Sequence, residues 1–372
     1  MIDLANLDGS NGFRVLPGDD GLPLFGLAVA GSDLNGDGLT DVAITDPFFS
    51  ATPTGTQGAV YVVYGSDAGF SVQIDVPEIA VGEGYALIGS NFGEVLGISV
   101  AGGGDFDGDG LDDLLIGEPQ SPGITRVAVS LGAAALGLAE FRTAELGGAL
   151  PGGLINSPDS AGRLGSTVAS LGDIDDDGLA DAFFGAIGAD QLGFIVYGTG
   201  DFEAADLSQT GAEATRLTSD RATGLSLAVG AGDVNGDTIA DVLVGLPRSV
   251  ESITPGTELP VQAGSAFVIL GGGPRDAALD TTGAAVELIG AGAGARLGAA
   301  LAGLGDVNGD GIDDFAVAAP GDPLSAAPQG PAAVYVVFGR TGGLPALVDV
   351  SALDGTDGFA IFGGGAQTGF GT

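Results

Sequence analysis

The sequence contains no cysteine, no histidine and no lysine, and these absences exclude several classes of site. Without cysteine or histidine, the chain forms no disulfide and no Cys/His zinc centre, and it offers neither a thiolate nucleophile nor a histidine base. Its ten basic residues are all arginines and face 49 acidic residues, which gives a formal net charge of −39. A field of this sign repels nucleic acid and anionic membranes and favours cations as partners.

Long apolar runs are absent too. No stretch of about 18 consecutive apolar residues occurs, so the sequence predicts no membrane insertion. Residues 1–10 show neither a basic segment nor an apolar segment of a secretory signal, which leaves three options open: a removed signal, another export route, or an internal protein. With 71 glycines and 45% apolar residues, the composition predicts short strands joined by tight turns, not long helices or a disordered acidic tail.

An acidic nonapeptide recurs five times, at 33–41, 105–113, 173–181, 233–241 and 306–314, with starts 60 to 73 residues apart. A run of small apolar residues precedes each copy, and two β-branched or aromatic runs and a more polar element follow it. Each repeat therefore predicts four antiparallel strands, with the acidic loop between the first and the second. Face-to-face packing of such sheets is an all-β fold, the β-propeller, in which each four-stranded repeat is a blade.

The repeats resemble FG-GAP repeats, the blades of the integrin α-subunit propeller. The residues that carry the resemblance are Phe25–Gly26, the acidic loops, and the endings "IGEP" (116–119), "VGLP" (244–247) and "VAAP" (317–320). The third repeat has "FGAIG" in place of the proline ending, and Thr238 replaces a loop glycine. The resemblance covers nearly the whole chain and implies structural calcium loops on one face of a seven-bladed ring, with partners bound elsewhere.

On this reading residues 1–372 form a single FG-GAP propeller domain. The repeats span roughly 17–90, 91–155, 156–218, 219–290 and 291–364, with partial repeat strands at 1–16 and 365–372. One terminal strand is surplus to a five-bladed ring, so three arrangements stay open. The chain is a segment of a longer propeller, or a closed five-bladed ring with a free strand, or a subunit whose spare strand pairs with another chain.

The acidic loop has the chemistry of a calcium site. Oxygen ligands at positions 1, 3 and 5 suit a hard cation, glycine at position 6 permits a sharp turn, and position 7 offers its carbonyl oxygen. In the integrin-like version position 9 supplies the last carboxylate and begins the next strand. No acid stands at position 12, so an EF-hand is rejected, and magnesium fits less well because it needs a tighter octahedral site. The predicted ligands are Asp33, Asn35, Asp37, Leu39 and Asp41; Asp105, Asp107, Asp109, Leu111 and Asp113; Asp173, Asp175, Asp177, Leu179 and Asp181; Asp233, Asn235, Asp237, Ile239 and Asp241; and Asp306, Asn308, Asp310, Ile312 and Asp314.

Two carboxylates about 4 Å apart repel by roughly 4 kcal/mol at an effective dielectric constant near 20. We therefore expect about five calcium ions to stabilise the folded chain by binding preferentially to it. The alternative is that the loops are solvated turns of an acidic protein. The acids beside the ligand positions, Asp46, Asp112, Asp176 and Asp313, are expected to be mostly solvated.

These features together predict a calcium-stabilised binding or adhesion module, outside the cell or at its surface, of an exported bacterial protein. Its partner would be an unidentified protein or glycan, with self-association through terminal strands also open. We expect no enzyme, because the usual catalytic groups are missing and no acid pair stands apart from the repeat. Two alternatives remain: a structural subunit of a surface layer or fibre, and a propeller domain, catalytic or not, of a polysaccharide-active enzyme.

Overall fold

The computed structural model describes residues 6–9, 11–17, 24–50, 55–120, 125–157, 163–187, 191–208, 210–219, 227–248, 263–276, 278–281, 284–289, 292, 294–321, 332–363 and 371. The chain divides into two compact units, the first made of residues 1–168 and 199–205, the second of residues 169–198 and 206–372. The strand predicted at 365–372 lies outside the described residues apart from Gly371. No helix within these ranges is long and apolar enough to cross a membrane.

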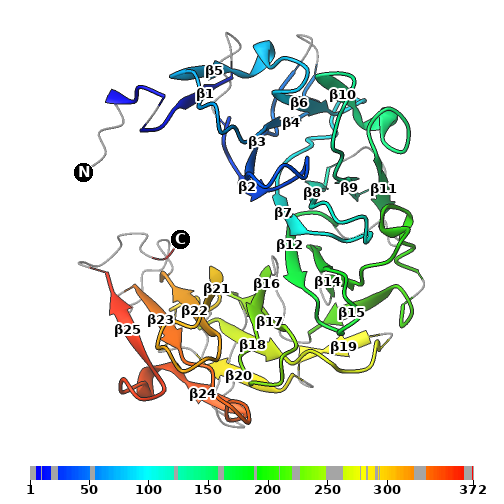
Figure 1. The fold of residues 1–372 in the computed structure, drawn as a ribbon. Coiled ribbons are helices and arrows are strands. Elements are labelled where there is room, and N and C mark those ends of the chain that lie inside the picture. The colour runs from blue at the N-terminus through cyan, green and yellow to red at the C-terminus, as the bar shows by residue number, and fades with distance from the viewer. Residues whose placement is uncertain are drawn as a thin grey trace. The chain divides into compact units, whose positions relative to one another are not determined.

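The described residues of the first unit include the first two acidic loops and the strands β1 to β11 (Figure 1). Short 3-10 helices accompany them: η2 (Val76–Glu78), η3 (Thr143–Glu145) and η4 (Phe202–Ala204). The strands are β1 (Arg14–Leu16), β2 (Val29–Ser32), β3 (Asp41–Asp46), β4 (Ala59–Val63), β5 (Gln73–Asp75), β6 (Gly84–Ile88), β7 (Val100–Gly104), β8 (Asp113–Glu118), β9 (Arg126–Ser130), β10 (Glu140–Arg142) and β11 (Gly152–Asn156).

The second unit contains the other three acidic loops, and β12 begins at its boundary with the first. It also holds the 3-10 helix η6 (Val350–Ala352). The strands are β12 (Thr167–Gly172), β13 (Asp181–Gly185), β14 (Gln191–Val196), β15 (Ala214–Thr218), β16 (Leu227–Gly232), β17 (Asp241–Leu246), β18 (Ser265–Ile269), β19 (Ala278–Asp280), β20 (Val286–Ile289), β21 (Leu301–Gly305), β22 (Asp314–Ala319), β23 (Ala333–Val337), β24 (Leu347–Asp349) and β25 (Gly358–Phe362).

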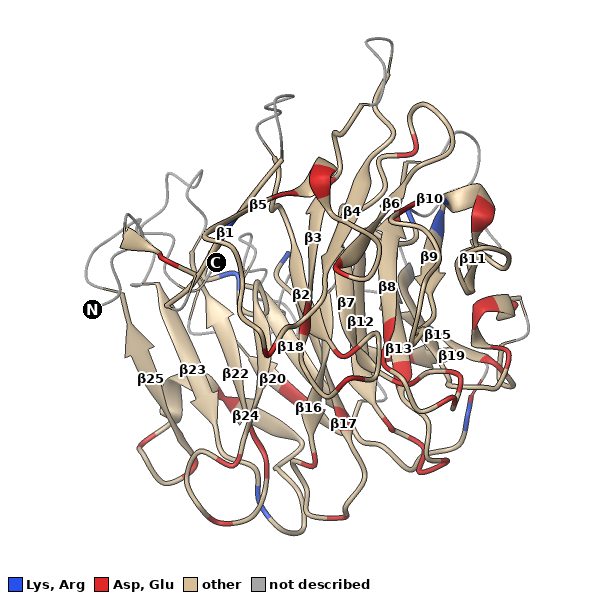
Figure 2. Ribbon diagram, turned by 45° about the horizontal axis from the view of Figure 1, so that its top comes forward, with Lys and Arg blue, Asp and Glu red and all other residues tan. Residues whose placement is uncertain are grey.

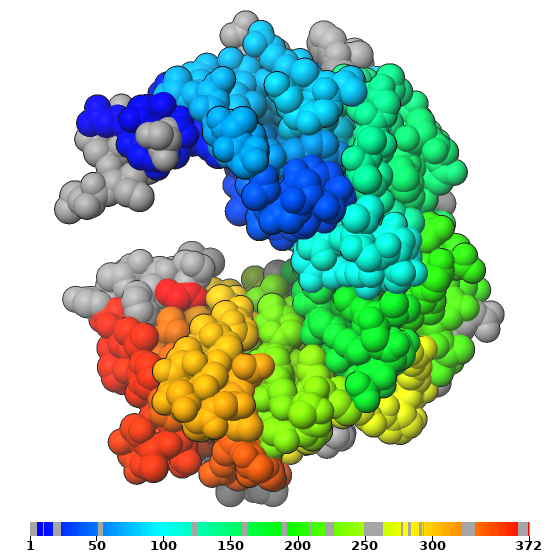
Figure 3. Space-filling view, in the orientation of Figure 1, coloured from blue at the N-terminus to red at the C-terminus, as the bar shows by residue number. Residues whose placement is uncertain are grey.

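Each repeat folds into one sheet of four antiparallel strands, which confirms the predicted all-β fold of propeller blades. The spatial orders follow the sequence: β2-β3-β4-β6, β7-β8-β9-β11, β12-β13-β14-β15, β16-β17-β18-β20 and β21-β22-β23-β25. In the space-filling view the bands of colour follow the repeats one after another within each unit (Figure 3). None of these sheets closes on itself within the described part of the chain. The blade number of a closed ring and the single-domain boundaries stay predictions.

A short parallel strand from the following repeat extends three of the sheets, and the sequence did not predict it. β10 pairs with β6, β19 with β15, and β24 with β20. The Glu287 N–H, for example, donates to the Ala346 carbonyl oxygen at 2.9 Å. β1 makes the same kind of parallel pair with β5. Within each unit, consecutive repeats are therefore joined by backbone hydrogen bonds at their outer strands as well as by packing.

The core of each unit lies between consecutive sheets and is built from the second and third strands. Val60 and Val62 of β4 and Leu114 and Ile116 of β8 are fully buried in one such cluster. In the second unit the corresponding cluster includes Phe315 of β22. Burying each such side chain contributes about 1.5–3 kcal/mol. The near-continuous apolar runs of the sequence therefore belong to strands that are covered on both faces.

Small residues allow the first strands of consecutive repeats to pack closely. A Cβ atom on Gly303 of β21 would lie 2.6 Å from the Gly230 carbonyl oxygen of β16. Gly298, just before β21, has a φ of +87°, and a Cβ there would lie 2.5 Å from the Ser265 carbonyl oxygen. Both positions exclude a larger residue, which explains the small-residue run before each acidic loop.

Candidate metal centres

The acidic loops connect the first strand of each sheet to the second, and the aspartate at position 9 begins the second strand. In Figure 2 many of the acidic residues, in red, lie in loops at strand ends. The position-9 side chains are completely buried, and both carboxylate oxygens accept backbone hydrogen bonds. In the second loop the Phe106 N–H donates to Asp113 Oδ2 and the Gly132 N–H to Asp113 Oδ1, both at 2.8 Å. The same pair of bonds is made at Asp41, Asp181, Asp241 and Asp314.

This arrangement gives position 9 a structural task. One hydrogen bond fixes position 2 of the loop, and the other fixes the second residue after the third strand of the same sheet. A single carboxylate therefore joins the loop to the first three strands. Burial opposes its charge: it raises the pKa of Asp113 and of Asp181 to about 7, and that of Asp241 to about 6.

The aspartate at position 1 organises the turn from inside. In the fifth loop, Asp306 Oδ1 accepts from the Gly309 N–H at 2.6 Å and Oδ2 accepts from the Gly311 N–H at 2.8 Å. The bond from Gly311, with a smaller contribution from that of Gly309, holds the pKa of Asp306 below its usual value. In the fourth loop Thr238 takes the place of this second glycine with a φ of +76°, and its N–H makes the same bond to Asp233 Oδ2 at 2.8 Å.

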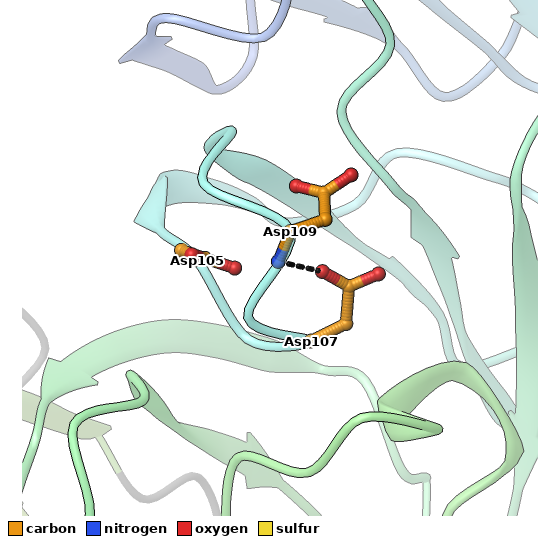
Figure 4. A group of neighbouring side chains, drawn as sticks. All are labelled: Asp105, Asp107 and Asp109. Carbon is orange, nitrogen blue, oxygen red and sulfur yellow. Dashed lines mark hydrogen bonds between the residues drawn. The ribbon is translucent and has the colours of Figure 1, made fainter.

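In the second loop three carboxylates come together. Asp105, Asp107 and Asp109 each offer an oxygen, and these atoms lie within 4.8 Å of one another. Figure 4 shows the three side chains on the loop, with the Asp109 N–H donating to Asp107 Oδ1 at 3.0 Å. Burial, followed by the neighbouring acids Asp109 and Asp105, raises the pKa of Asp107. This oxygen-only set, with excess negative charge, fits a hard divalent cation.

The first, fourth and fifth loops have asparagine at position 3. Its amide donates a hydrogen bond to the position-5 carboxylate, where the second loop has a third carboxylate. Asn35 Nδ2 donates to Asp37 Oδ2 at 3.2 Å, and Asn308 Nδ2 donates to Asp310 Oδ2 at 3.0 Å. Asn235 makes the same contact in the fourth loop at 3.0 Å. In these loops an amide partly compensates the position-5 carboxylate, whereas the second loop leaves two carboxylates facing each other.

The third loop also gathers three carboxylates, those of Asp173, Asp175 and Asp177, within 4.8 Å. Unlike the second loop, it is in contact with an arginine of the following repeat. Arg275 Nη2 donates to Asp177 Oδ2 at 2.8 Å, and Arg275 Nε donates to Asp175 Oδ2. A protein cation thus lies against two of the predicted metal ligands.

The structure therefore places the predicted ligands unequally. Side-chain oxygens of positions 1, 3 and 5 come together in the second and third loops, where they form the acidic groups. In the first, fourth and fifth loops the position-3 amide contacts the position-5 carboxylate. Position 9 does not belong to those groups, because its oxygens face backbone N–H donors. At position 7 the backbone N–H of Leu39, Leu111, Leu179, Ile239 and Ile312 donates to Oδ1 of the position-5 aspartate. Metal ligation by the carboxylates at position 9 and the carbonyl oxygens at position 7 stays a prediction.

Two acids expected to be solvated instead join neighbouring loops. Asp112 Oδ2 accepts from the Ser32 hydroxyl and from the Asp33 N–H, both at 3.0 Å, and Asp313 Oδ2 accepts from the Asp233 N–H at 3.0 Å. Asp46 is buried as well, with 4% of its surface exposed. The expectation of solvation was wrong for the buried Asp46. Asp112 and Asp313 are half-buried, and Asp176 is exposed as expected. The partners of Asp112 and Asp313 lie about 80 positions away in the sequence, so no local pattern marks them.

Comparison with known proteins places three of these repeats in a described family. The family model for the FG-GAP repeat matches residues 25–63, 96–135 and 297–337, which contain the first, second and fifth acidic loops. Integrin alpha-PS2 of Drosophila melanogaster is 37% identical over 153 residues, or 38% of this chain and 10% of that protein. Integrin alpha-4 of Xenopus laevis is 28% identical over 166 residues, or 45% of this chain and 14% of that protein.

A phospholipase carries a similar segment. Phosphatidylinositol-glycan-specific phospholipase D of Dictyostelium discoideum is 30% identical over 122 residues, or 29% of this chain and 12% of that protein. The aligned part of the chain thus spans only 10 to 14% of the length of these three relatives. Among solved structures, the crystal structure of the V. cholerae biofilm matrix protein Bap1 aligns with 66% of this chain and 37% of that chain at 14% identity, with a TM-score of 0.25.

Proposed function

Because this chain is built of FG-GAP repeats of the integrin alpha type, we propose that it is a calcium-stabilised binding or adhesion module acting outside the cell or at its surface. The observation that carries the proposal is the group of Asp105, Asp107 and Asp109, whose ligand oxygens lie within 4.8 Å of one another inside a segment that matches the FG-GAP family. The family relation supports the adhesion role, and the donor set supports the cation.

Calcium is the proposed ion because of the donors and the shape of the loop. Positions 1, 3 and 5 offer only oxygen atoms, and calcium accepts six to eight oxygens in an adaptable geometry. We propose about five ions, one in each loop, with the tightest binding where four carboxylates are present and no protein cation competes. That condition singles out the second loop. A location outside the cell supplies calcium at concentrations that fill even weak sites of this kind.

Cation binding is proposed to act through the strands. The loop that holds the ion is tied by the buried position-9 aspartate to three strands of its sheet, so neutralising the loop stabilises the sheet as a whole. By mass action, an ion that binds only the folded chain adds about 2.7 kcal/mol at a concentration 100 times its dissociation constant. We therefore expect calcium at millimolar concentration to raise the unfolding temperature.

The proposal includes that the chain is not an enzyme. The sequence lacks histidine, cysteine and lysine, and in the described residues the groups of three or more acids with oxygens within 4.8 Å lie in the repeated loops. The partner is proposed to be a protein or a glycan, bound by a surface that the calcium loops hold in shape. The net charge of −39 argues against nucleic acid and anionic membranes as partners.

The experiment has two parts. Thermal unfolding is followed in EGTA and in millimolar calcium, with magnesium as the control ion, and glycan and protein arrays are then probed under the same conditions. We expect a higher unfolding temperature in calcium than in magnesium, and array binding that EGTA abolishes. Equal unfolding temperatures in EGTA and calcium would refute the calcium role. Turnover of a polysaccharide substrate would replace the binding module with an enzyme.

One observation favours self-association as a second function. β25 is the outer strand of its sheet, and within the described residues it has no parallel partner of the kind that β6, β15 and β20 have. Its side chains Phe359, Ile361 and Phe362 are 40%, 45% and 60% exposed. An uncovered apolar edge is a template for pairing with another chain. Sedimentation at increasing protein concentration tests this: Ile361→Lys should abolish any dimer, and a monomer at all concentrations excludes the function.

A further inference from the structure

Arg275 lies where a metal ion is expected in the third loop. Its guanidinium bridges the two acids at positions 3 and 5, donating from Nη2 to Asp177 Oδ2 at 2.8 Å and from Nε to Asp175 Oδ2. The same group lies 4.5 Å from the centre of the Tyr197 ring, which stabilises a cation through its negative face. In the described part of the chain, no other acidic loop has an ion pair with an arginine.

Arg275 contacts Oδ2 of the position-5 aspartate, the oxygen that would face a cation bound in the loop. Oδ1 of the position-5 aspartate is occupied in every loop by the backbone N–H of position 7; in the third loop the Leu179 N–H donates to Asp177 Oδ1 at 3.0 Å. Only Oδ2 is left to face a bound ion. In the first, fourth and fifth loops this oxygen accepts from the asparagine amide of position 3, and in the third loop it accepts from Arg275.

Arg275 also changes the position of Asp175. In the second loop the equivalent Asp107 turns Oδ1 towards the Asp109 N–H. In the third loop Asp175 Oδ1 is buried and accepts no hydrogen bond. The Asp177 N–H donates to Asp173 Oδ1 at 3.2 Å, a bond that the first, fourth and fifth loops also make. The side chain at position 3 is therefore held by the guanidinium and not by the turn.

A backbone hydrogen bond between one repeat and the preceding loop, found in each unit, places this arginine beside the third loop. The third residue after the third strand of one repeat donates its N–H to the position-2 carbonyl oxygen of the preceding loop. These bonds run from Ala133 to Leu34, Thr199 to Phe106, Gly272 to Ile174 and Arg340 to Val234, at 2.8 to 3.1 Å. Three residues beyond each donor stand Leu136, Phe202, Arg275 and Gly343. Phe202 stacks on Phe106 of the second loop, with ring centres 4.9 Å apart, whereas Arg275 reaches the acids of the third.

Counted at the predicted ligand positions and with Arg275 included, the loops have one of two formal charges, −4 in the second loop and −3 in the others. At its predicted ligand positions the second loop has four carboxylates, counting Asp113, and no protein cation against them. The third loop also has four, counting Asp181, but Arg275 reduces its formal charge from −4 to −3, which equals the charge of each loop with asparagine at position 3. Charge-assisted hydrogen bonds from a planar guanidinium to two carboxylates are strong and geometrically specific.

We propose that Arg275 is a built-in counter-cation of the third loop: it neutralises Asp175 and Asp177 when no metal is bound and must leave Asp177 Oδ2 before a divalent cation binds there. The inference rests on the proposed calcium binding of the loops. It makes the third loop the weaker of the two four-carboxylate loops for calcium, although the two sequences offer the same ligands. The third loop remains folded without metal, and the second loop depends on metal.

The test compares Arg275→Gln with the wild type in chelator and in calcium. Without the guanidinium the facing acids repel, so the variant should unfold at a lower temperature in EGTA and show a larger rise on adding calcium. Calcium affinity at the third loop should increase by at least about tenfold, because a positive charge no longer competes at the ligand oxygens. Arg340→Gln is the matched control: Arg340 pairs with Asp357, which is not a loop ligand, and neither quantity should change.

Terbium luminescence identifies the loop that responds. Tb³⁺ replaces calcium at oxygen sites and is excited through nearby tyrosines, and Tyr197 is the ring beside this loop. The Tb³⁺ titration of Arg275→Gln should gain a tighter phase that disappears when Tyr197→Phe is added. The double variant Asp175→Asn/Arg275→Gln gives the third loop the asparagine pattern of the first, fourth and fifth, and should recover the stability in EGTA that Arg275→Gln loses.

Each outcome decides between the two proposals. If the wild type binds neither Ca²⁺ nor Tb³⁺, the proposed function fails. If the wild type binds both ions and Arg275→Gln matches it in affinity and unfolding temperature, the calcium function stands and the role of Arg275 is refuted. If Arg275→Gln is already unfolded in EGTA but folds when calcium is added, the loss of stability is larger than expected and the proposal is supported. Failure to fold in calcium as well would overturn the role of Arg275, because calcium would then not replace the guanidinium.

Discussion

Replacing Asp107 with asparagine should make the second loop behave like the loops that have asparagine at position 3. The new Oδ1 can keep the bond from the Asp109 N–H, and the new amide can donate to Asp109 Oδ2, as Asn308 does to Asp310. The substitution removes one charge and leaves the size of the side chain unchanged. Without metal it should therefore stabilise the chain, while weakening calcium binding.

The size of the effect follows from the spacing of the acids. Two unit charges 4.8 Å apart repel by about 3.5 kcal/mol at an effective dielectric constant of 20. Because Asp109 is exposed, solvent screening reduces this to about 1 kcal/mol. The new hydrogen bond adds about 0.5–1 kcal/mol. We expect Asp107→Asn to raise the unfolding temperature in chelator by about 3–8 °C, since 1 kcal/mol corresponds to about 2–4 °C in a unit of this size.

The fifth loop provides the reciprocal substitution. Asn308→Asp should remove the amide donor from Asp310 Oδ2 and add a fourth carboxylate, so it should lower stability in chelator by a similar amount and increase the stabilisation by calcium. Circular dichroism melts in EDTA and in millimolar calcium measure both variants, and native mass spectrometry counts the bound ions. Changes of the same sign in the two variants would refute the electrostatic reasoning, as would a larger calcium shift for Asp107→Asn than for the wild type.

Three further predictions concern the turn, the buried acid and pH. Thr238→Gly should raise the unfolding temperature by about 1–3 °C, because relief of the left-handed backbone, about 1–2 kcal/mol, exceeds the entropic cost of glycine, about 0.5–1 kcal/mol; no change in a thermal melt would contradict this. Asp314→Asn should lower the free energy of unfolding by about 2–4 kcal/mol in calcium and in chelator alike, because its amide nitrogen would face a backbone N–H donor; urea unfolding measures this, and a loss confined to calcium would show a metal ligand instead. In metal-free protein, stability should fall as pH rises from about 4 to about 7, because burial raises the folded-state pKa of Asp113 and Asp181 to about 7, so that the folded chain binds more protons than the unfolded chain in this range; urea titrations at a series of pH values should show this slope, and the opposite slope would count against it.

The repeat made the sheets predictable, because the patterns that specify them are local. Position 9 was predicted to begin a strand, and β3, β8, β13, β17 and β22 begin at Asp41, Asp113, Asp181, Asp241 and Asp314. The alternation of turn residues with short β-branched runs is a local pattern that five copies reinforce. Thr238 stands where the other loops have a turn residue with positive φ, and its own φ of +76° lies in the same left-handed region.

Contacts between repeats were not predictable, because they depend on how one sheet is placed against the next. Arg275 lies 98 positions from Asp177, and Asp112 lies 79 positions from Asp33. Nothing near either residue in the sequence distinguishes it from a solvated surface charge. The parallel strands β10, β19 and β24 are only three residues long and gain their partners from the preceding repeat. Such short segments have little tendency of their own to be strands, and packing decides their state.

The same connections explain why the charge of a loop matters beyond the loop. Position 2 uses its N–H to bind the buried position-9 aspartate of its own sheet and its carbonyl oxygen to bind the following repeat, as Ile174 does with Asp181 and with Gly272. Repulsion that opens a loop therefore strains a junction between repeats, and a cation that closes the loop secures that junction. Arg275 follows Gly272 by three residues, so the third loop receives its positive charge from the repeat that the junction holds. The contact that neutralises the third loop and the contact that packs the next repeat against it are therefore made by the same segment.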